Sequence, residues 1–118
     1  MARKDELGRR GEDLAARFLE DAGYRVVARN WRCARGEIDI IARTGDTLVF
    51  VEVKTRSSLA FGHPFEAITA TKLARLRVLA GAWCAETSPA APRIRLDAIA
   101  VVAPREGPAS VEHLLGVF

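Results

Sequence analysis

The chain has 118 residues, of which 49% are hydrophobic and 28% are charged. This balance excludes an intrinsically disordered protein, and the length suits one globular domain spanning 1–118. Lys and Arg outnumber Asp and Glu by 18 to 15, so the net charge is +3, which permits a nucleic-acid partner without requiring one.

The two cysteines and the N-terminal segment indicate the compartment. Cys33 and Cys84 lie far apart in no metal-binding spacing, as expected of free thiols in a reducing environment. The charged N-terminus lacks the apolar stretch of a signal peptide, and no apolar run reaches the ~18 residues of a membrane span. We therefore expect a cytoplasmic protein that does not associate with membranes.

The first part of the chain predicts a helix followed by a strand. Apolar residues recur at helical spacing from about residue 5 to residue 22, and Gly23 supplies a stop signal. Residues 24–31 have the composition of a short strand, and residues 32–36 are expected to form a connection.

A β-hairpin is predicted at the centre of the sequence. Residues 37–43 and 47–54 are rich in Ile, Val and Phe, which favour strands. Thr44, Gly45 and Asp46 lie between them and form a strong turn signal.

The second half of the chain adds one helix and two strands. Residues 55–64 are expected to form an exposed loop, and residues 66–85 carry apolar side chains at helical spacing. Residues 93–102 predict a strand, residues 104–108 a turn, and residues 111–118 a last strand or an extended tail. The order α-β-β-β-α-β-β predicts an α/β fold, with a mixed β-sheet flanked by helices.

The expected hairpin places two carboxylates side by side. A turn centred on Gly45 and Asp46 pairs residues whose numbers sum to 91, so Asp39 lies opposite Glu52, and Glu37 lies opposite Lys54, all on one face. Side chains opposite each other in an antiparallel pair have Cβ atoms about 4.5 to 5.5 Å apart, so the two acids would repel each other. The other face should pack into the core through Ile38, Ile40, Val49, Val51 and Val53.

Such a pair of acids predicts a metal-dependent hydrolase. A divalent cation, Mg²⁺ or Mn²⁺, can be held by the carboxylates of Asp39 and Glu52, with the backbone carbonyl of Val53 as a further ligand. Lys54 projects on the same side, where it could orient or deprotonate the attacking water and balance charge on a phosphate. Glu12, at the margin of the first helix's apolar stripe, is the candidate for a third catalytic acid.

Purely structural roles compete with these assignments to different degrees. Glu37 and Lys54 could form a cross-strand ion pair, and Glu12 could be a first-turn charge favoured by the helix dipole. A structural role is harder to find for Asp39 with Glu52, because like charges opposite each other in a buried sheet are costly.

The sequence around these acids resembles a known nuclease signature. GEIDII at 36–41, followed by VEVKTR at 51–56, is similar to the PD-(D/E)XK motif in its Holliday-junction-resolvase-like form. Asp39, Glu52 and Lys54 match the motif's metal and catalytic positions. Ile38 replaces the motif's proline, which contributes backbone shape and no ligand.

A wider set of landmarks resembles the YraN family of bacterial proteins. These landmarks are GRRGE at 8–12, the hairpin, Phe61-Gly62, PFEA at 64–67, and Lys72 with Arg75-Leu76. The likeness spans nearly the whole chain. It implies a restriction-endonuclease-like core, in which Glu12, Asp39, Glu52 and Lys54 match the acidic and basic site positions.

Basic residues near the acids are candidates for nucleic-acid binding. Arg9 and Arg10 precede Glu12, Arg56 follows Lys54, and Lys72 with Arg75 lie on the second helix, so these five could ring the site. They would neutralise phosphates without reading sequence, although each could equally be part of a solvated helix face.

The aromatic residues that follow the second hairpin strand could have either of two roles. Phe61, His63 and Phe65 follow the catalytic strand, where an aromatic could stack on an unpaired base, but anchoring of the loop to the core is the favoured interpretation. Trp31 and Trp83 are assigned to packing.

Together these features predict a metal-dependent endonuclease that acts on nucleic acid, with DNA as the expected partner, and that recognises branched or single-stranded structure. A non-cleaving or partner-activated nucleic-acid-binding module is the alternative. A hydrolase or lyase of a small phosphorylated substrate is a third reading, disfavoured because the sequence has no glycine-rich phosphate loop. A two-fold branched substrate would suit a homodimer, although no pattern in the sequence fixes an interface.

Overall fold

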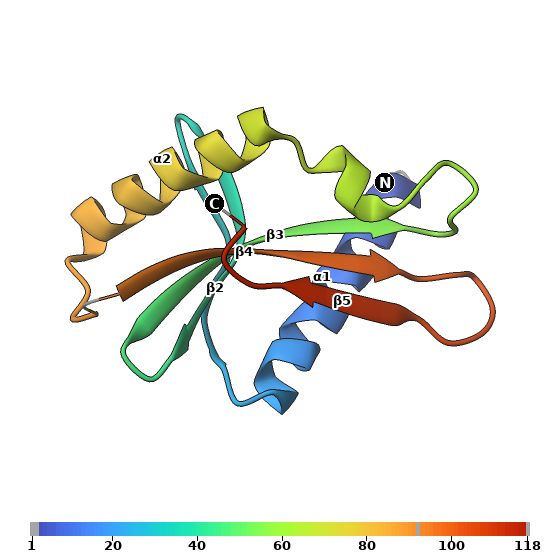
Figure 1. Cartoon of the computed structure of the whole chain (residues 1–118), viewed down its shortest axis with the longest axis horizontal. Helices are drawn as coiled ribbons and strands as arrows, with labels where there is room; N and C mark the ends of the chain where they lie inside the picture. The colour runs from blue at the N-terminus through green and yellow to red at the C-terminus, as the bar shows by residue number, and fades with distance from the viewer. Residues whose placement is uncertain (1–2, 92, 118) are drawn as a thin grey trace.

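The computed structural model describes residues 3–91 and 93–117 and has the predicted α/β architecture. A five-stranded mixed sheet has its strands in chain order, with β3 and β4 parallel and all other neighbours antiparallel (Figure 1). The order α-β-β-β-α-β-β is confirmed and is consistent with a restriction-endonuclease-like core. The elements are α1 (Arg3–Asp21), β1 (Arg25–Cys33), β2 (Gly36–Thr44), β3 (Thr47–Arg56), the 3₁₀ helix η1 (Pro64–Ala67), α2 (Ala70–Thr87), β4 (Arg93–Val102) and β5 (Ser110–Leu114).

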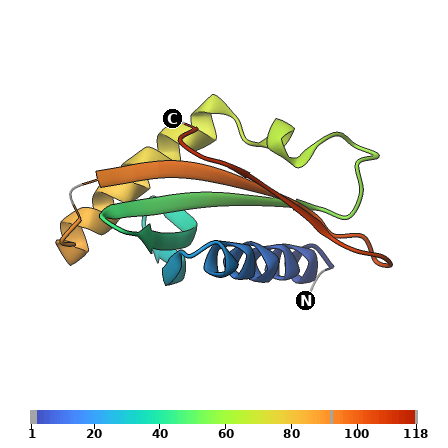
Figure 2. The same cartoon turned by 60° about the horizontal axis from the view of Figure 1, so that its bottom comes forward.

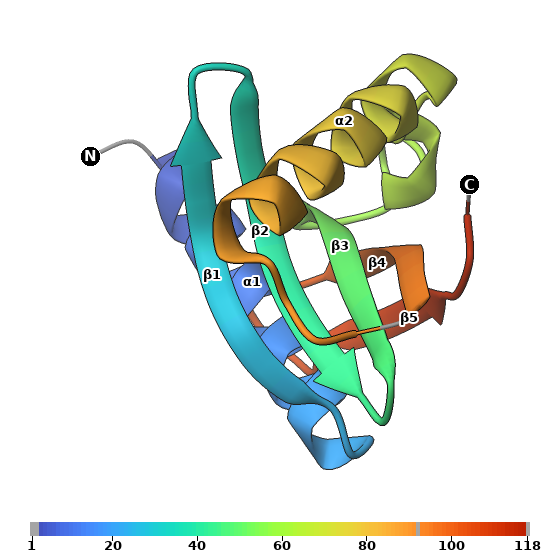
Figure 3. The ribbon, with the colours of Figure 1, turned by 90° about the vertical axis from the view of Figure 1, so that its left-hand side faces the viewer.

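The two helices cover opposite faces of the sheet (Figures 2 and 3). Between α1 and the sheet lies a core that we call the α1-side core, whose buried residues include Ala15, Leu19, Ile40, Val49, Val51, Val53 and Ile99. Between α2 and the sheet lies the α2-side core, which includes Ile38, Ile41, Phe50, Leu76, Leu79 and Trp83. Neither helix of the described chain is long and apolar enough to cross a membrane.

The hairpin has the predicted register. Pairing runs from Thr44↔Thr47 at the turn to Ile40↔Val51, with numbers that sum to 91 throughout. Asp39 and Glu52 are the next residues on their strands.

One part of the predicted hairpin pattern is wrong. Ile40, Val49, Val51 and Val53 pack in the α1-side core as expected, but Ile38 packs in the α2-side core. The alternation of side chains along β2 is therefore interrupted at Asp39, between two isoleucines that belong to different cores.

The start of the second helix also differs from the prediction. Residues 64–67 form the separate helix η1, whose N-terminus is capped by His63 and Glu66. The His63 amide donates to Glu66 Oε2 (3.0 Å), and His63 Nδ1 accepts from the Phe65 amide (3.1 Å). After an extended residue, α2 begins with Thr69 as its N-cap, and the Thr69 hydroxyl accepts from the Lys72 amide. Local capping side chains therefore replace the single helix expected over 66–85 with two elements.

The remaining bounds differ by a few residues. The predicted strand 93–102 matches β4, whereas β1 runs on to Cys33 and β3 to Arg56, both into expected loops. The last strand ends at Leu114, and beyond it the Val117 amide donates to the Leu96 carbonyl (2.8 Å). Residue 118 of the expected tail lies outside the described residues.

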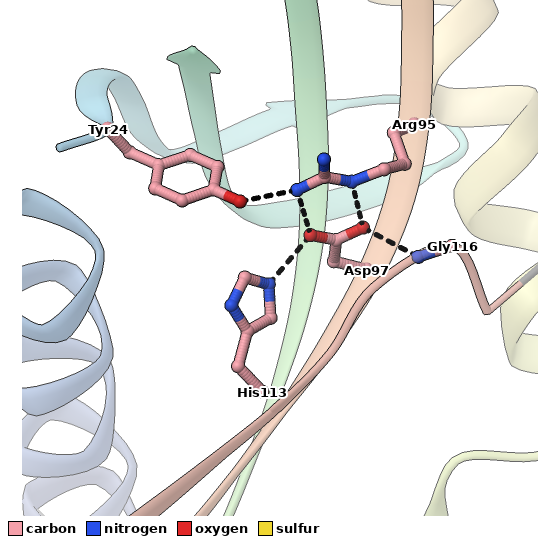
Figure 4. Close-up of polar contacts among 5 residues, drawn as sticks. All are labelled: Tyr24, Arg95, Asp97, His113 and Gly116. Carbon is pink, nitrogen blue, oxygen red and sulfur yellow. Dashed lines mark hydrogen bonds and ion pairs between the residues drawn. The ribbon is translucent and has the colours of Figure 1, made fainter. Parts of the chain in front are cut away.

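A buried polar network fastens this C-terminal segment to the sheet (Figure 4). The Asp97 side chain on β4 is fully buried and accepts hydrogen bonds from Arg95, from His113 (2.7 Å) and from the Gly116 amide (3.0 Å). Arg95 also donates to the Tyr24 hydroxyl (2.6 Å). Burial opposes ionisation, but the hydrogen bonds from His113 and Arg95 outweigh it and lower the pKa of Asp97. Asp97 is therefore a paired, structural carboxylate.

Candidate active site

The two predicted metal ligands lie where the β2–β3 pairing stops. The Val53 amide donates to Asp39 Oδ2 at 2.8 Å, so the carboxylate is held against the backbone of the neighbouring strand. Glu52 immediately precedes Val53 on β3. The predicted neighbourhood of Asp39 and Glu52 is thus present, fixed by a side-chain-to-backbone hydrogen bond.

Asp39 is in an environment that disfavours its charge. Burial raises its pKa from 3.8 to about 8, and repulsion from Glu52 contributes in the same direction. The Val53 amide opposes this rise, while Glu12 and Glu37 add to it. Near neutral pH the isolated site therefore holds a proton on Asp39.

Burial also disfavours the ionised form of Glu52, but two lysine side chains partly offset this effect. Burial raises its pKa, Lys72 and Lys54 lower it, and Glu12 and Glu37 raise it. Lys54, two residues further along the same strand, is thus close enough for its charge to act on Glu52.

A close helix–strand contact brings Glu12 to this cluster. Gly11 is buried against the end of β3, and a Cβ atom at this position would lie 1.8 Å from Thr55 Oγ1. Only glycine allows α1 to approach so closely, and the next residue, Glu12, consequently lies near Asp39 and Glu52. The first-turn interpretation of Glu12 is wrong, because α1 begins at Arg3.

Two residues that sequence reasoning missed hold Glu12 in place. Burial raises the pKa of Glu12, and a hydrogen bond with Asn30 and the charge of Arg29 lower it. Asn30 has a positive φ of 53° within β1. Asparagine tolerates this conformation better than most residues, so the single Asn inside the predicted strand was the feature of the sequence that could have indicated an irregular backbone there.

Glu37 has a different partner from the one predicted. Arg32 Nε on β1 donates to Glu37 Oε2 at 2.6 Å, and the two residues pair across β1 and β2. The cross-strand ion pair is therefore with Arg32 and not with Lys54.

Two hollows border the acids, and basic residues line both. A groove of about 510 Å³ between α1, the end of β3 and the following loop is lined by Glu12, Val53, Lys54 and Arg56, among others. A smaller cleft of about 150 Å³ beneath α2 is lined by Glu37, Glu52, Lys72 and Arg75.

The other two predicted nucleic-acid-binding residues lie on the exposed side of α1. Arg10 donates to the Pro104 carbonyl (2.9 Å), which ties α1 to the segment after β4. Arg9 is exposed and lines neither hollow. The structure therefore brings Arg56, Lys72 and Arg75 to the hollows that border the acids and leaves Arg9 and Arg10 outside them, on the surface of α1.

Comparison with known proteins identifies the family. Residues 11–101 match the profile described as "Uncharacterised protein family UPF0102". The chain belongs to the UPF0102 family. UPF0102 proteins of Beutenbergia cavernae and Arthrobacter sp. (strain FB24) are 60% and 58% identical over 117 residues, with 99% of each chain covered. One from Paenarthrobacter aurescens is 56% identical, covering 99% of this chain and 97% of its own.

The YraN-family membership expected from the sequence is thereby confirmed, and the matched segment includes the acids and Lys54. In this UPF0102 protein, the described residues contain no group of three or more His, Cys, Asp or Glu side chains arranged to hold a metal ion. The candidate ligand set is smaller: two carboxylates, from Asp39 and Glu52, and the backbone carbonyl of Val53.

Proposed function

We propose that this UPF0102 protein is a metal-dependent endonuclease that hydrolyses phosphodiester bonds of DNA and selects branched or single-stranded structure. The observation that carries the proposal is the Asp39–Glu52 pair, two half-buried carboxylates of raised pKa beside Lys54. A fold that maintains such unfavourable charges needs a compensating ligand or reaction. Asp97 shows by contrast how a structural carboxylate in the same sheet is neutralised by its partners.

The donor chemistry fits a hard divalent cation. Carboxylate and carbonyl oxygens suit Mg²⁺ and Mn²⁺, and a double positive charge would relieve the repulsion that raises the pKa of Asp39. Asp39, Glu52 and the Val53 carbonyl would hold the ion. When bound, it would supply positive charge to polarise the phosphate and favour ionisation of the attacking water.

The chain's own residues account for the other requirements of the reaction. Lys54 borders the groove next to Glu52, where its ammonium group can hold the attacking water or balance the charge that grows on the phosphate. Glu12, in the same groove, can accept a proton from a water held there, because its raised pKa makes it a better base than a free carboxylate.

Basic residues would bind the DNA backbone. Arg56 lies in the larger groove, and Lys72 with Arg75 lies in the smaller cleft, so phosphates can approach the acids past both. Contacts of this kind position a strand without reading its sequence, and binding should weaken steeply as salt is added. We place the protein in the cytoplasm, supported by the free thiols of Cys33 and Cys84.

A cleavage panel tests the proposed function. End-labelled branched, flapped, single-stranded and duplex DNAs of matched sequence are incubated with Mg²⁺, Mn²⁺ or chelator. The proteins are the wild type, Asp39→Asn, Glu52→Gln and the control Asp21→Asn, an exposed carboxylate at the end of α1. We expect metal-dependent cutting by the wild type and the control, and a loss of at least about a hundredfold in the other two variants.

Two outcomes would contradict the proposal. Cutting that survives both Asp39→Asn and Glu52→Gln would assign it to a contaminant or to another site. Salt-sensitive DNA binding by the wild type without any cutting would favour the alternative, a binding module that does not cleave unaided.

A further inference from the structure

The larger groove is lined both by residues of the candidate active site and by an exposed aromatic side chain. Glu12, Val53 and Lys54 belong to the candidate active site. Arg56, Ser57, Ser58 and Phe61 line the same groove. The loop after β3 and the N-terminal half of α1 lie at the same end of the molecule (Figure 2).

Phe61 differs from the other two aromatic residues of its loop. His63 caps η1 and contacts Glu112 Oε1 (2.8 Å), and the rings of His63 and Phe65 lie 5.0 Å apart. These two residues therefore anchor the loop, as expected from the sequence. Phe61 is 88% exposed and contributes no such anchor. A phenyl ring left in water forgoes the favourable free energy of burial, which suits a ring that is covered by a ligand.

Arg56 supplies a second, independent sign of a missing partner. Its Nε atom is buried and has no hydrogen-bond partner among the described residues. A buried N–H group without an acceptor is costly, and a guanidinium group pairs best with a phosphate or carboxylate. Because Arg56 lines the groove between Lys54 and Phe61, an anionic ligand entering there would meet it.

The side chains that line the groove are chemically complementary to a nucleotide. The lining includes two cationic side chains, two serine residues and a flat aromatic ring. Phosphate oxygens match the first group, and the face of a nucleobase matches the ring. In a duplex both faces of a base are covered by its stacked neighbours, so only an unpaired nucleotide could use Phe61.

We propose that this groove binds one unpaired nucleotide of the DNA, with its base stacked on Phe61 and its phosphate held by Arg56 and Lys54. The inference deepens and rests on the proposed function, because it names the feature of the substrate that the site selects. The protein would thus prefer single strands, flaps or junctions that expose an unpaired nucleotide over continuous duplex.

Binding measured without cleavage tests this inference separately from the nuclease activity. The affinities of a fluorescent single strand and of the matched duplex are measured by anisotropy at low salt, with chelator and in parallel with Ca²⁺. The variants are Phe61→Ala, Phe61→Trp and the control Leu59→Ala, an apolar residue of the same loop that is 58% exposed and does not line the groove. Because both positions are exposed, circular dichroism should show unchanged folding in all three variants.

We expect Phe61→Ala to weaken single-strand binding roughly ten- to a hundredfold, the usual effect of losing one base–aromatic stack, with little effect on the duplex. Phe61→Trp should retain binding, and Leu59→Ala should change it by less than about twofold. Arg56→Gln should weaken binding and reduce its salt dependence by about one phosphate contact.

Three results would overturn the inference. They are no single-strand binding by the wild type in either condition, equal effects of Phe61→Ala and Leu59→Ala, and equal losses of single-strand and duplex binding. The two proposals fail separately: Phe61-dependent binding without cutting would refute only the nuclease, and cutting indifferent to Phe61→Ala would refute only the nucleotide subsite.

Discussion

Replacing Asp39 with asparagine should stabilise the metal-free protein while removing its activity. The substitution keeps an oxygen that can accept the hydrogen bond of the Val53 amide, and it removes the charge that burial and Glu52 oppose. Functional sites commonly reduce stability in this way, because their charges are arranged for a ligand and not for the fold.

The size of the gain follows from the pKa of Asp39. Folding raises this pKa from 3.8 to about 8, so at about pH 7 folding must restore a proton that the unfolded chain has released. Each pH unit above 3.8 costs the folded state about 1.4 kcal/mol until its own pKa is reached. At about pH 7 the cost is about 4 kcal/mol, and asparagine avoids it.

Denaturant unfolding at a series of pH values, with chelator present, measures this effect. Because the folded pKa is raised, Asp39 lowers wild-type stability as pH rises from about 4 to about 8. The difference between Asp39→Asn and the wild type should therefore be near zero at about pH 4 and grow to about 4 kcal/mol at about pH 7. Added Mg²⁺ or Mn²⁺ should stabilise the wild type more than the variant.

The exposed carboxylate Asp21 provides the matched control. Asp21→Asn removes a charge at the C-terminal end of α1 and should change stability by no more than about 0.5 kcal/mol. The reasoning would be refuted if Asp39→Asn destabilised the protein at about pH 7, or if its effect did not change with pH.

Two further predictions concern packing and the structural carboxylate. Gly11→Ala should lower the free energy of unfolding by about 1 to 3 kcal/mol and reduce activity, because its Cβ would lie 2.7 Å from Thr55 Cβ. Gly8→Ala, with no atom within 4 Å of its Cβ, should raise stability by about 0.5 to 1 kcal/mol, and equal effects of the two alanines would contradict the packing argument. Asp97→Asn should cost about 3 kcal/mol in denaturant unfolding, because Arg95 loses its buried partner; a stabilisation like that of Asp39→Asn would be inconsistent with the network. The lowered pKa of Asp97 means that its contribution is present above its unfolded value of 3.8 and is lost as pH falls below it.

The features of the fold that could be predicted are those set by local sequence. The hairpin register follows from the two-residue turn at Gly45 and Asp46, because a tight turn fixes which residues of the two strands pair with each other. The placement of Asp39 next to Glu52 follows from that register. The error at the start of α2 is of a different kind, because apolar periodicity continues across Ile68, the C-cap of η1, and Thr69, the N-cap of α2.

Contacts between distant segments could not be predicted from periodicity. The partners of Asp97 come from β4, from β5 and from the segment after it, and Arg95 is in turn bound by Tyr24, just before β1 (Figure 4). In sequence, Asp97 looks much like Glu52, since each is an acid in an apolar strand. Only the structure separates the two, because it gives one carboxylate hydrogen-bonding partners that lower its pKa and leaves the other with a raised pKa.

The same limit applies to the basic and aromatic residues near the site. Arg56, Lys72 and Arg75 line the hollows that border the acids, but the closeness of Arg9 and Arg10 to Glu12 along the chain does not bring them there. Likewise, the favoured anchoring role suits His63 and Phe65 but not the exposed Phe61. Side-chain direction in a loop depends on contacts that sequence spacing does not fix.

The metal dependence of DNA cleavage tests the central claim most directly. Wild-type protein is stripped with chelator, and its rate on a labelled single strand is followed as Mg²⁺ or Mn²⁺ is added back, beside Glu52→Gln treated identically. We expect no cutting by the stripped protein, saturable recovery for the wild type, and no recovery for the variant. Cutting by the stripped wild type, or equal recovery by Glu52→Gln, would contradict the assignment of Asp39 and Glu52 as the site that holds the ion.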